Sequence, residues 1–221
     1  MLAQLGNFTA VTTRMAVYLV AGLLVGMVVR EFVRASVASR LHDPTPRLWG
    51  RLTWDPRSWF DPFGAGLVPG LIAVLWAAGV FWSPAAYGKP APIDPSYFRH
   101  HRRDVVLVSL AGPSATLVLA FASGFAFRAV ASGGGELALV LLVLTHAFAG
   151  LTVFHLLPVP GLDGARIVAL LLPPAAAQVY RNADKYLPLF VLVLLFLFGT
   201  AILGALTAAL CSLATGEACI P

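Results

Sequence analysis

The sequence predicts an all-α, multi-pass membrane protein organised as one membrane domain over residues 1–221. Of the 221 residues, 59% are hydrophobic and 11% are charged, whereas soluble domains contain roughly 45–50% apolar and about 25% charged residues. The mean hydropathy is +0.84, and several apolar segments reach the roughly 20 residues that a helix needs to cross a bilayer. This length and composition leave no room for a sizeable soluble domain.

Four segments are long and apolar enough to form transmembrane helices. We expect them at about residues 11–40, 105–131, 137–157 and 187–213. Between the first two, residues 46–59 alternate apolar and basic side chains in part and contain several tryptophans, which favour membrane interfaces. We expect a short strand pair or an interfacial loop there, so the predicted fold class includes a short β or interfacial stretch.

Residues 64–82 form a fifth apolar segment that either crosses the membrane or re-enters it. If it crosses, the lysines and arginines of the loops divide almost evenly between the two sides. If it re-enters, only Arg14 and Arg128 lie opposite all the others, which obeys the positive-inside rule far better. We therefore favour a re-entrant segment packed against the helices around a cavity, with the basic loops cytoplasmic and both termini outside.

The basic charge of the chain does not indicate a nucleic-acid partner. The net charge is +5 and the pI is near 9.7, but the basic residues lie in loops beside apolar spans, where they orient a membrane protein. The excess of arginine over lysine favours a bacterial source, so we expect a bacterial plasma membrane and its lipid bilayer as the surroundings.

The two cysteines, Cys211 and Cys219, lie near the end of the chain and do not form a CxxC pair, which argues against a structural zinc site. If that end faces an oxidising compartment, a disulfide between them would persist. The sequence leaves open whether this disulfide forms.

Three ionisable residues interrupt the end of the first apolar segment. In the stretch VVREFVRASVASRLHDPT, Arg30, Glu31 and Arg34 stand at positions i, i+1 and i+4 of a helix, and residues four apart share a helix face. This is the spacing of the zinc-binding motif HExxH, in which two histidines bind the metal and the glutamate acts on the bound water. Here arginines stand at both histidine positions.

The stretch REFVRASVASRLHDPT resembles the site-2 protease family of intramembrane zinc metalloproteases, whose pattern is close to HExxHAxxAxxLGDPT. Four further stretches resemble family motifs in the family order, so the similarity covers residues 30–167. They are GRLTWDPRSWFDPFG (50–64), GKPAPIDP (88–95), LAGPSATLVLA (110–120) and FHLLPVPGLDGARI (154–167). The resemblance implies the site-2 protease core.

The departures from the family pattern concentrate at its chemistry. The family's zinc ligands are the two histidines and the aspartate of LDG; of these only the aspartate remains, as Asp163, and the glutamate remains as Glu31. Other positions also differ: His155 replaces an Asn before LLP, Thr116 an Asn after AGP, Trp59 a His before IDP, and His42 a Gly before DPT.

Arginine has no lone pair with which to bind zinc. The sequence therefore predicts no catalytic residues and no metal or other cofactor, with a degenerate site at Arg30, Glu31, Arg34, His155 and Asp163. We expect the two arginines to pair with the two carboxylates in place of a metal, because an unpaired charge at membrane depth costs at least about 2.5–3.5 kcal/mol and arginine holds carboxylates by parallel hydrogen bonds. The alternative is that both arginines extend to the membrane interface.

Three functions are compatible with these residues. The first, which we favour, is a catalytically inactive relative acting as a structural, regulatory or substrate-binding component with protein partners in the membrane, as in a subunit of a larger complex. The second is an active intramembrane metalloprotease whose zinc is held at a non-standard site by Asp163, His155 and Glu31, with His146 as a further candidate ligand. The third is a path for a proton or small solute, since intramembrane charges often mark one.

Overall fold

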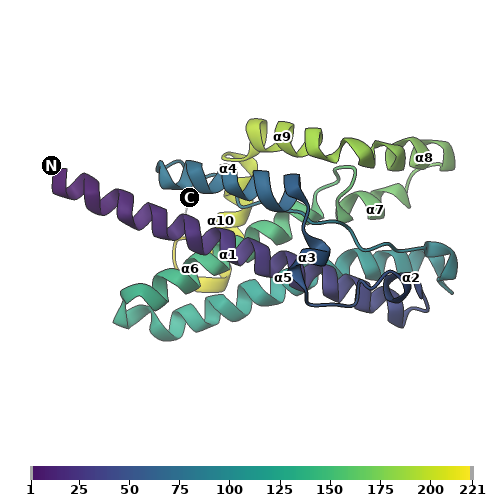
Figure 1. Ribbon diagram of the computed structural model, residues 1–221, viewed down its shortest axis with the longest axis horizontal. Helices are drawn as coiled ribbons and strands as arrows, with labels where there is room; N and C mark the ends of the chain where they lie inside the picture. Colours follow the sequence, from purple (N-terminus) through teal and green to yellow (C-terminus); the bar gives the residue numbers. More distant parts are fainter. Residues whose placement is uncertain (1, 220–221) are drawn as a thin grey trace.

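The fold is a bundle of long helices with shorter helices on one side (Figure 1). The computed structural model describes residues 2–219, with side chains from residue 9 onward. No strand occurs in this part of the chain, so the all-α, multi-pass fold class is confirmed. The α-helices are α1 Leu2–Arg40, α2 Thr45–Leu48, α3 Pro56–Trp59, α4 Val68–Ala77, α5 His101–Val130, α6 Gly135–Leu156, α7 Asp163–Ala169, α8 Pro174–Asn182, α9 Leu187–Phe198 and α10 Ile202–Thr215.

Three helices, α1, α5 and α6, form the centre of the bundle and are long and apolar enough to cross a membrane. α5 and α6 lie antiparallel because the chain reverses at Gly134 and Gly135, whose φ angles of 61° and 86° suit glycine. α1 approaches α6 closely through Gly22 and Gly26, which are one turn apart. A Cβ added to Gly22 would lie 2.8 Å from Leu144 Cδ2, so the small residues set the spacing of these two helices, as in other membrane bundles.

The last apolar segment differs from the single straight helix predicted at 187–213. The helical run that ends at Phe198 and the helix that begins at Ile202 meet at 80°. At the break, the backbone N–H of Ser83 donates to the carbonyl of Gly199 (3.1 Å), and Ser83 Oγ lies 2.9 Å from Thr207 Oγ1 of α10. A segment distant in sequence thus supplies the polar contacts that a continuous helix would make for itself.

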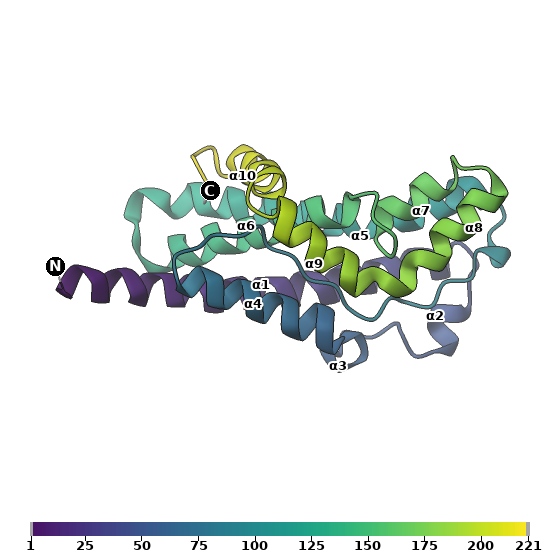
Figure 2. The ribbon, with the colours of Figure 1, turned by 90° about the horizontal axis from the view of Figure 1, so that it is seen from above.

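The apolar segment 64–82 forms a hairpin with the chain that follows it. A π-helical turn, Pro62–Leu67, continues into α4, and the apolar helix that they form together, Pro62–Ala77, is shorter than the roughly 20 residues that a crossing needs. The chain then returns in an extended form beside its own entry: Tyr87 N–H donates to Gly64 O (3.0 Å) and Lys89 N–H to Trp59 O (2.9 Å). Figure 2 shows α4 lying along α1 and the chain running back toward the start of α5. The re-entrant course of residues 64–82 stays a prediction.

The strand alternative for residues 46–59 was wrong. Two short helices, α2 and α3, occupy its ends, with a loop between them. Pro46 and Pro56 lie in the first turns of these helices, where a backbone N–H would have no partner within the helix and proline therefore fits. In a strand, the same prolines could not donate to the hydrogen-bond ladder. Asp55 caps α3 by accepting a hydrogen bond from Arg57 N–H (3.0 Å), and Trp59, fully buried, donates its Nε1–H to Thr53 O (2.9 Å).

α1 ends in a strained turn that is tied to the returning chain. His42 has a φ of +75°, a left-handed conformation that a residue with a Cβ rarely adopts; the site-2 protease pattern has glycine at this position. Next to it, the buried carboxylate of Asp43 accepts hydrogen bonds from Thr45 N–H (2.9 Å) and Asp94 N–H (2.9 Å). The end of α1 and the end of the hairpin are therefore held by one side chain.

Replacing His42 tests the strain in this turn. The side chain is exposed, so His42→Ala removes its contacts and leaves the left-handed backbone, whereas His42→Gly also removes the strain. We expect the glycine variant to be more stable than the alanine variant by about 1 kcal/mol, after allowing for the greater freedom of glycine in the unfolded chain. Thermal melting of both variants in detergent measures the difference, and an alanine variant of equal or higher melting temperature would contradict the left-handed turn.

Candidate functional site

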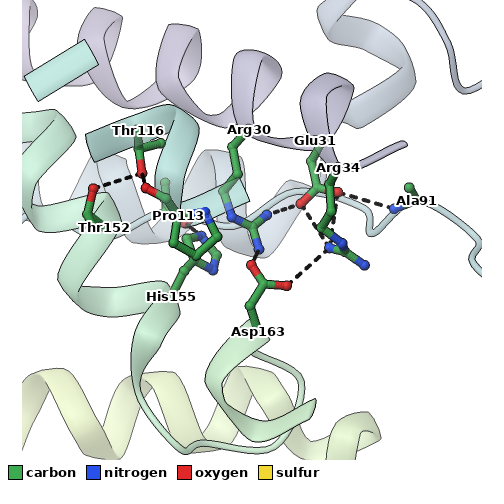
Figure 3. A network of polar contacts seen from close by, with 10 residues as sticks. Arg30, Glu31, Arg34, Ala91, Pro113, Thr116, Thr152, His155 and Asp163 are labelled. Atoms are coloured by element: carbon green, nitrogen blue, oxygen red, sulfur yellow. Dashed lines mark hydrogen bonds and ion pairs between the residues drawn. The ribbon is translucent and has the colours of Figure 1, made fainter. Parts of the chain in front are cut away.

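The charged residues of α1 meet the start of α7 at the centre of the bundle (Figure 3). Asp163 is the first residue of α7, and the turn between α6 and α7 brings it there. That turn contains Pro158, Pro160 and Gly161, whose φ of 91° suits glycine. The helix break places a carboxylate opposite α1 that a continuous helix would carry elsewhere.

Arg30, Glu31, Arg34 and Asp163 form a closed set of ion pairs, which we call the charge quartet. Arg30 donates through Nη1 to Glu31 and through Nη2 to Asp163. Arg34 Nη1 lies 3.3 Å from Glu31 Oε2 and 3.6 Å from Asp163 Oδ1. Glu31 Oε2 also accepts a hydrogen bond from Ala91 N–H of the returning chain (3.2 Å). Two guanidinium groups and two carboxylates give the quartet no net charge.

Burial shows that the arginines do not extend to the membrane interface. Arg30 is 3% exposed and Arg34 is 2% exposed, while Glu31 and Asp163 are each 1% exposed. Charges so deeply buried are tolerated when they are paired and hydrogen-bonded. The predicted pairing of the two arginines with the two carboxylates is confirmed.

Two glycines make room for the quartet. A Cβ added to Gly112 of α5 would lie 2.9 Å from Arg30 Cγ and 3.4 Å from Asp163 Oδ2. A Cβ added to Gly164 would collide with the backbone carbonyl of Leu156 at the end of α6. Both glycines belong to the family-like motifs LAGPSATLVLA and GLDGARI, and here they let α5 and α7 approach the side chains of α1.

Several polar residues around the quartet bond to one another or to the backbone. His155 is 1% exposed, and its Nε2 lies 3.0 Å from the carbonyl oxygen of Ala86 in the returning chain. Thr116 Oγ1 donates to Pro113 O (3.0 Å) and lies 2.8 Å from Thr152 Oγ1. His155 therefore anchors the hairpin beside the quartet, while the two threonines join α5 to α6.

The residues of the quartet do not fit a zinc ion. Zinc requires three or four nitrogen, sulfur or oxygen ligands, and Arg30 and Arg34 offer none. Within residues 2–219, Glu31, His155 and Asp163 do not bring three ligand atoms close enough to hold one ion. The carboxylates that remain are already bonded to guanidinium groups, so we derive no metal-dependent step at this position.

His146 does not lie with the quartet, which corrects its assignment as a further ligand there. It lies beside the two cysteines, at the contact of α6 with α10. Cys211 and Cys219 are joined in a disulfide, with Cα atoms 5.9 Å apart, which answers the question that the sequence left open.

Sequence reasoning did not single out Arg166, although it lies in the family-like stretch GLDGARI. It lines a cavity of about 520 Å³ beside α7 and α5. Other residues around this cavity include Ile93, Phe98, His101, Val108 and Asp184. The sequence did contain a signal for Arg166: it stands three residues after Asp163, and residues at this helical spacing are neighbours on the helix surface.

Curated proteins of bacteria resemble this chain over most of its length. A Bacillus subtilis (strain 168) protein named "Putative zinc metalloprotease YwhC" is 33% identical over 177 residues, which cover 76% of this chain and 75% of that protein. A Mycobacterium tuberculosis (strain H37Rv) protein named "Putative zinc metalloprotease Rip2" is 32% identical over 184 residues, 80% of this chain and 66% of that protein. A Mycolicibacterium smegmatis protein of the same name is 30% identical over 199 residues, 81% of this chain and 66% of that protein.

No protein-family model matches the chain. No solved structure matches it either.

Removing Asp163 tests whether the quartet holds the bundle together. Asp163→Ala leaves Arg30 and Arg34 buried with one carboxylate, and breaking a buried pair in this way costs about 3–5 kcal/mol. We expect a large fall in the melting temperature of the purified protein in detergent. The matched control is Glu136→Ala, which breaks a half-exposed ion pair with Arg14 and a hydrogen bond from the Tyr18 hydroxyl and should cost about 1 kcal/mol.

A double variant separates pairing from packing. Arg30→Met with Asp163→Leu removes one charge of each sign and leaves Arg34 and Glu31 as a balanced pair. It should be more stable than Asp163→Ala, since apolar replacement of both partners is often neutral. An unchanged melting temperature for Asp163→Ala, or a double variant no more stable than Asp163→Ala, would contradict a stabilising role for these ion pairs.

Proposed function

This chain belongs to the site-2 protease family of intramembrane metalloproteases, and we propose that it is a catalytically inactive member, a pseudoprotease of the membrane. The proposal rests on one observation. The guanidinium of Arg30 is bonded to both Glu31 and Asp163, the two residues that correspond to the catalytic glutamate and the remaining zinc ligand of the family pattern.

Glu31 acts here as a counter-ion and not as a base. Its carboxylate accepts hydrogen bonds from Arg30, Arg34 and the Ala91 N–H. These contacts hold the carboxylate in place, and arginine has no lone pair with which to accept a proton. Both carboxylate oxygens are thus engaged, Oε1 by Arg30 and Arg34 and Oε2 by Arg34 and Ala91.

The elements that surround the family's catalytic position remain fastened together in this chain. A rigid membrane scaffold of this kind is suited to holding other proteins. The quartet, His155 and Asp43 together fasten α1, α7 and the hairpin to one another. A protein of this kind serves as a structural, regulatory or substrate-binding component, as in a subunit of a membrane complex. We place it in a bacterial plasma membrane with its basic loops cytoplasmic and both termini outside, following the positive-inside rule.

A proteolysis assay tests the proposal directly. The full chain is reconstituted in proteoliposomes, with its disulfide intact and zinc supplied, together with model substrates that have one transmembrane helix. We expect no cleavage that differs between the natural chain and Glu31→Gln. Cleavage that is abolished by Glu31→Gln and by a zinc chelator would overturn the proposal in favour of an active metalloprotease.

Restoring the two histidines tests whether the arginines are what prevents metal binding. In Arg30→His with Arg34→His, two imidazoles and Asp163 can supply three ligands. We expect this double variant to bind one more equivalent of zinc than the natural chain under oxidising conditions, and to lose it again when Asp163→Asn is added. Metal content after gel filtration measures this. If the double histidine variant bound no additional zinc, the two arginines would not be what prevents metal binding at this position.

A further inference from the structure

A second cluster of metal-binding side chains lies away from the quartet. It comprises His146 of α6, Cys211 of α10 and Cys219 of the segment after α10, and their ligand atoms all lie within 4.8 Å of one another. His146 is 1% exposed and Cys211 is fully buried. The Nδ1 atom of His146 has no hydrogen-bond partner among the described residues. In residues 2–219 it is the only group of three or more such residues that meets this spacing.

The fold brings these three residues together by turning the end of the chain back. α10 ends at Thr215 and is followed by Gly216, whose φ of 76° is left-handed. The chain then folds back toward α10, where Cys219 N–H lies 3.4 Å from Ser212 Oγ. Arg128 of α5 fastens this end by donating to Ala214 O (2.9 Å). Cys219 thus reaches Cys211, to which it is bonded in this structure.

We propose that the chain binds zinc(II) at His146, Cys211 and Cys219 when this disulfide is reduced. A dithiol reductant gives two electrons and two protons to the disulfide, which becomes two thiols while the reductant becomes a disulfide. Zinc then replaces the two thiol protons and takes a lone pair from the neutral imidazole of His146. Three protein ligands leave a fourth tetrahedral position for water.

Distance and charge both favour zinc. Zinc–sulfur and zinc–nitrogen bonds of about 2.3 and 2.1 Å place tetrahedral ligand atoms roughly 3.5–3.8 Å apart, so the present spacing requires only small side-chain movements beyond opening the disulfide. Two thiolates cancel the charge of a divalent ion, and the site stays neutral inside an apolar bundle, where a net charge is costly. A monovalent ion such as copper(I) would leave one negative charge. This site is independent of the proposed loss of proteolysis, because it uses no residue of the quartet.

Cobalt(II), which takes the tetrahedral sites of zinc and reports thiolate ligands by a charge-transfer band, tests the proposal. The full chain in detergent is reduced with dithiothreitol, freed of reductant without oxygen, and titrated with cobalt and then with zinc. We expect one equivalent of cobalt with a thiolate band, displaced by zinc, and no band in the oxidised protein. His146→Ala and Cys219→Ser should each lower the affinity at least about tenfold, since even indirect partners of metal ligands contribute that much.

Two control variants separate this site from the family's metal position. His155→Ala and Asp163→Asn should leave the cobalt band and its stoichiometry unchanged. Cys219 lies in the terminal segment and is only half-buried, so its serine variant tests the site even if His146→Ala fails to fold. A reduced natural chain without a thiolate band, or an unchanged band in both ligand variants, overturns the zinc site. Metal lost on changing Asp163, with both cysteines intact and the variant still folded by thermal melting, overturns the pseudoprotease proposal as well.

Discussion

Arg30 of α1 donates hydrogen bonds to Glu31 on its own helix and to Asp163 at the start of α7, and the positions of the neighbouring elements follow from these two contacts. A charge inside an apolar bundle must be balanced, so α7 has to begin where its aspartate meets α1. The break before α7, at Pro158, Pro160 and Gly161, meets that requirement. Gly112 leaves room for Arg30, and Gly164 leaves room for the end of α6.

The hairpin depends on the same centre. Its returning chain is extended, so its backbone N–H and C=O groups cannot bond to one another as they do in a helix. Neighbouring side chains must supply the hydrogen-bond partners. The returning chain donates Ala91 N–H to Glu31, offers Ala86 O to His155, and is held by Asp43 at its end. The carboxylate of Glu31 therefore helps to hold the returning chain of the hairpin beside α1.

The two candidate metal positions differ in what balances the charge. At the quartet, guanidinium groups stand where the family pattern places histidines, and the carboxylates are already neutralised. At His146, Cys211 and Cys219 the cysteines carry no charge while joined in a disulfide, and a divalent ion would balance them once they are reduced and ionised. Zinc in this protein would therefore not by itself indicate proteolysis, because the cysteine site lies outside the degenerate one.

The sequence alone determined the multi-pass helical class and the family resemblance, because apolar length and motif spacing are local properties. The need to balance charge led us to expect Arg30 and Arg34 to pair with Glu31 and Asp163, but only the structure decided between this pairing and an extension of the arginines to the interface. The sequence did not determine the strandless form of residues 46–59, where proline positions outweighed the alternating pattern, or the bend between α9 and α10, which depends on Ser83. His146 lies 65 residues or more from the cysteines in the sequence, so the sequence did not indicate that they meet. Only the tertiary structure decided these features, since each depends on contacts between segments far apart in the chain, whose distances the pattern of any one segment does not encode.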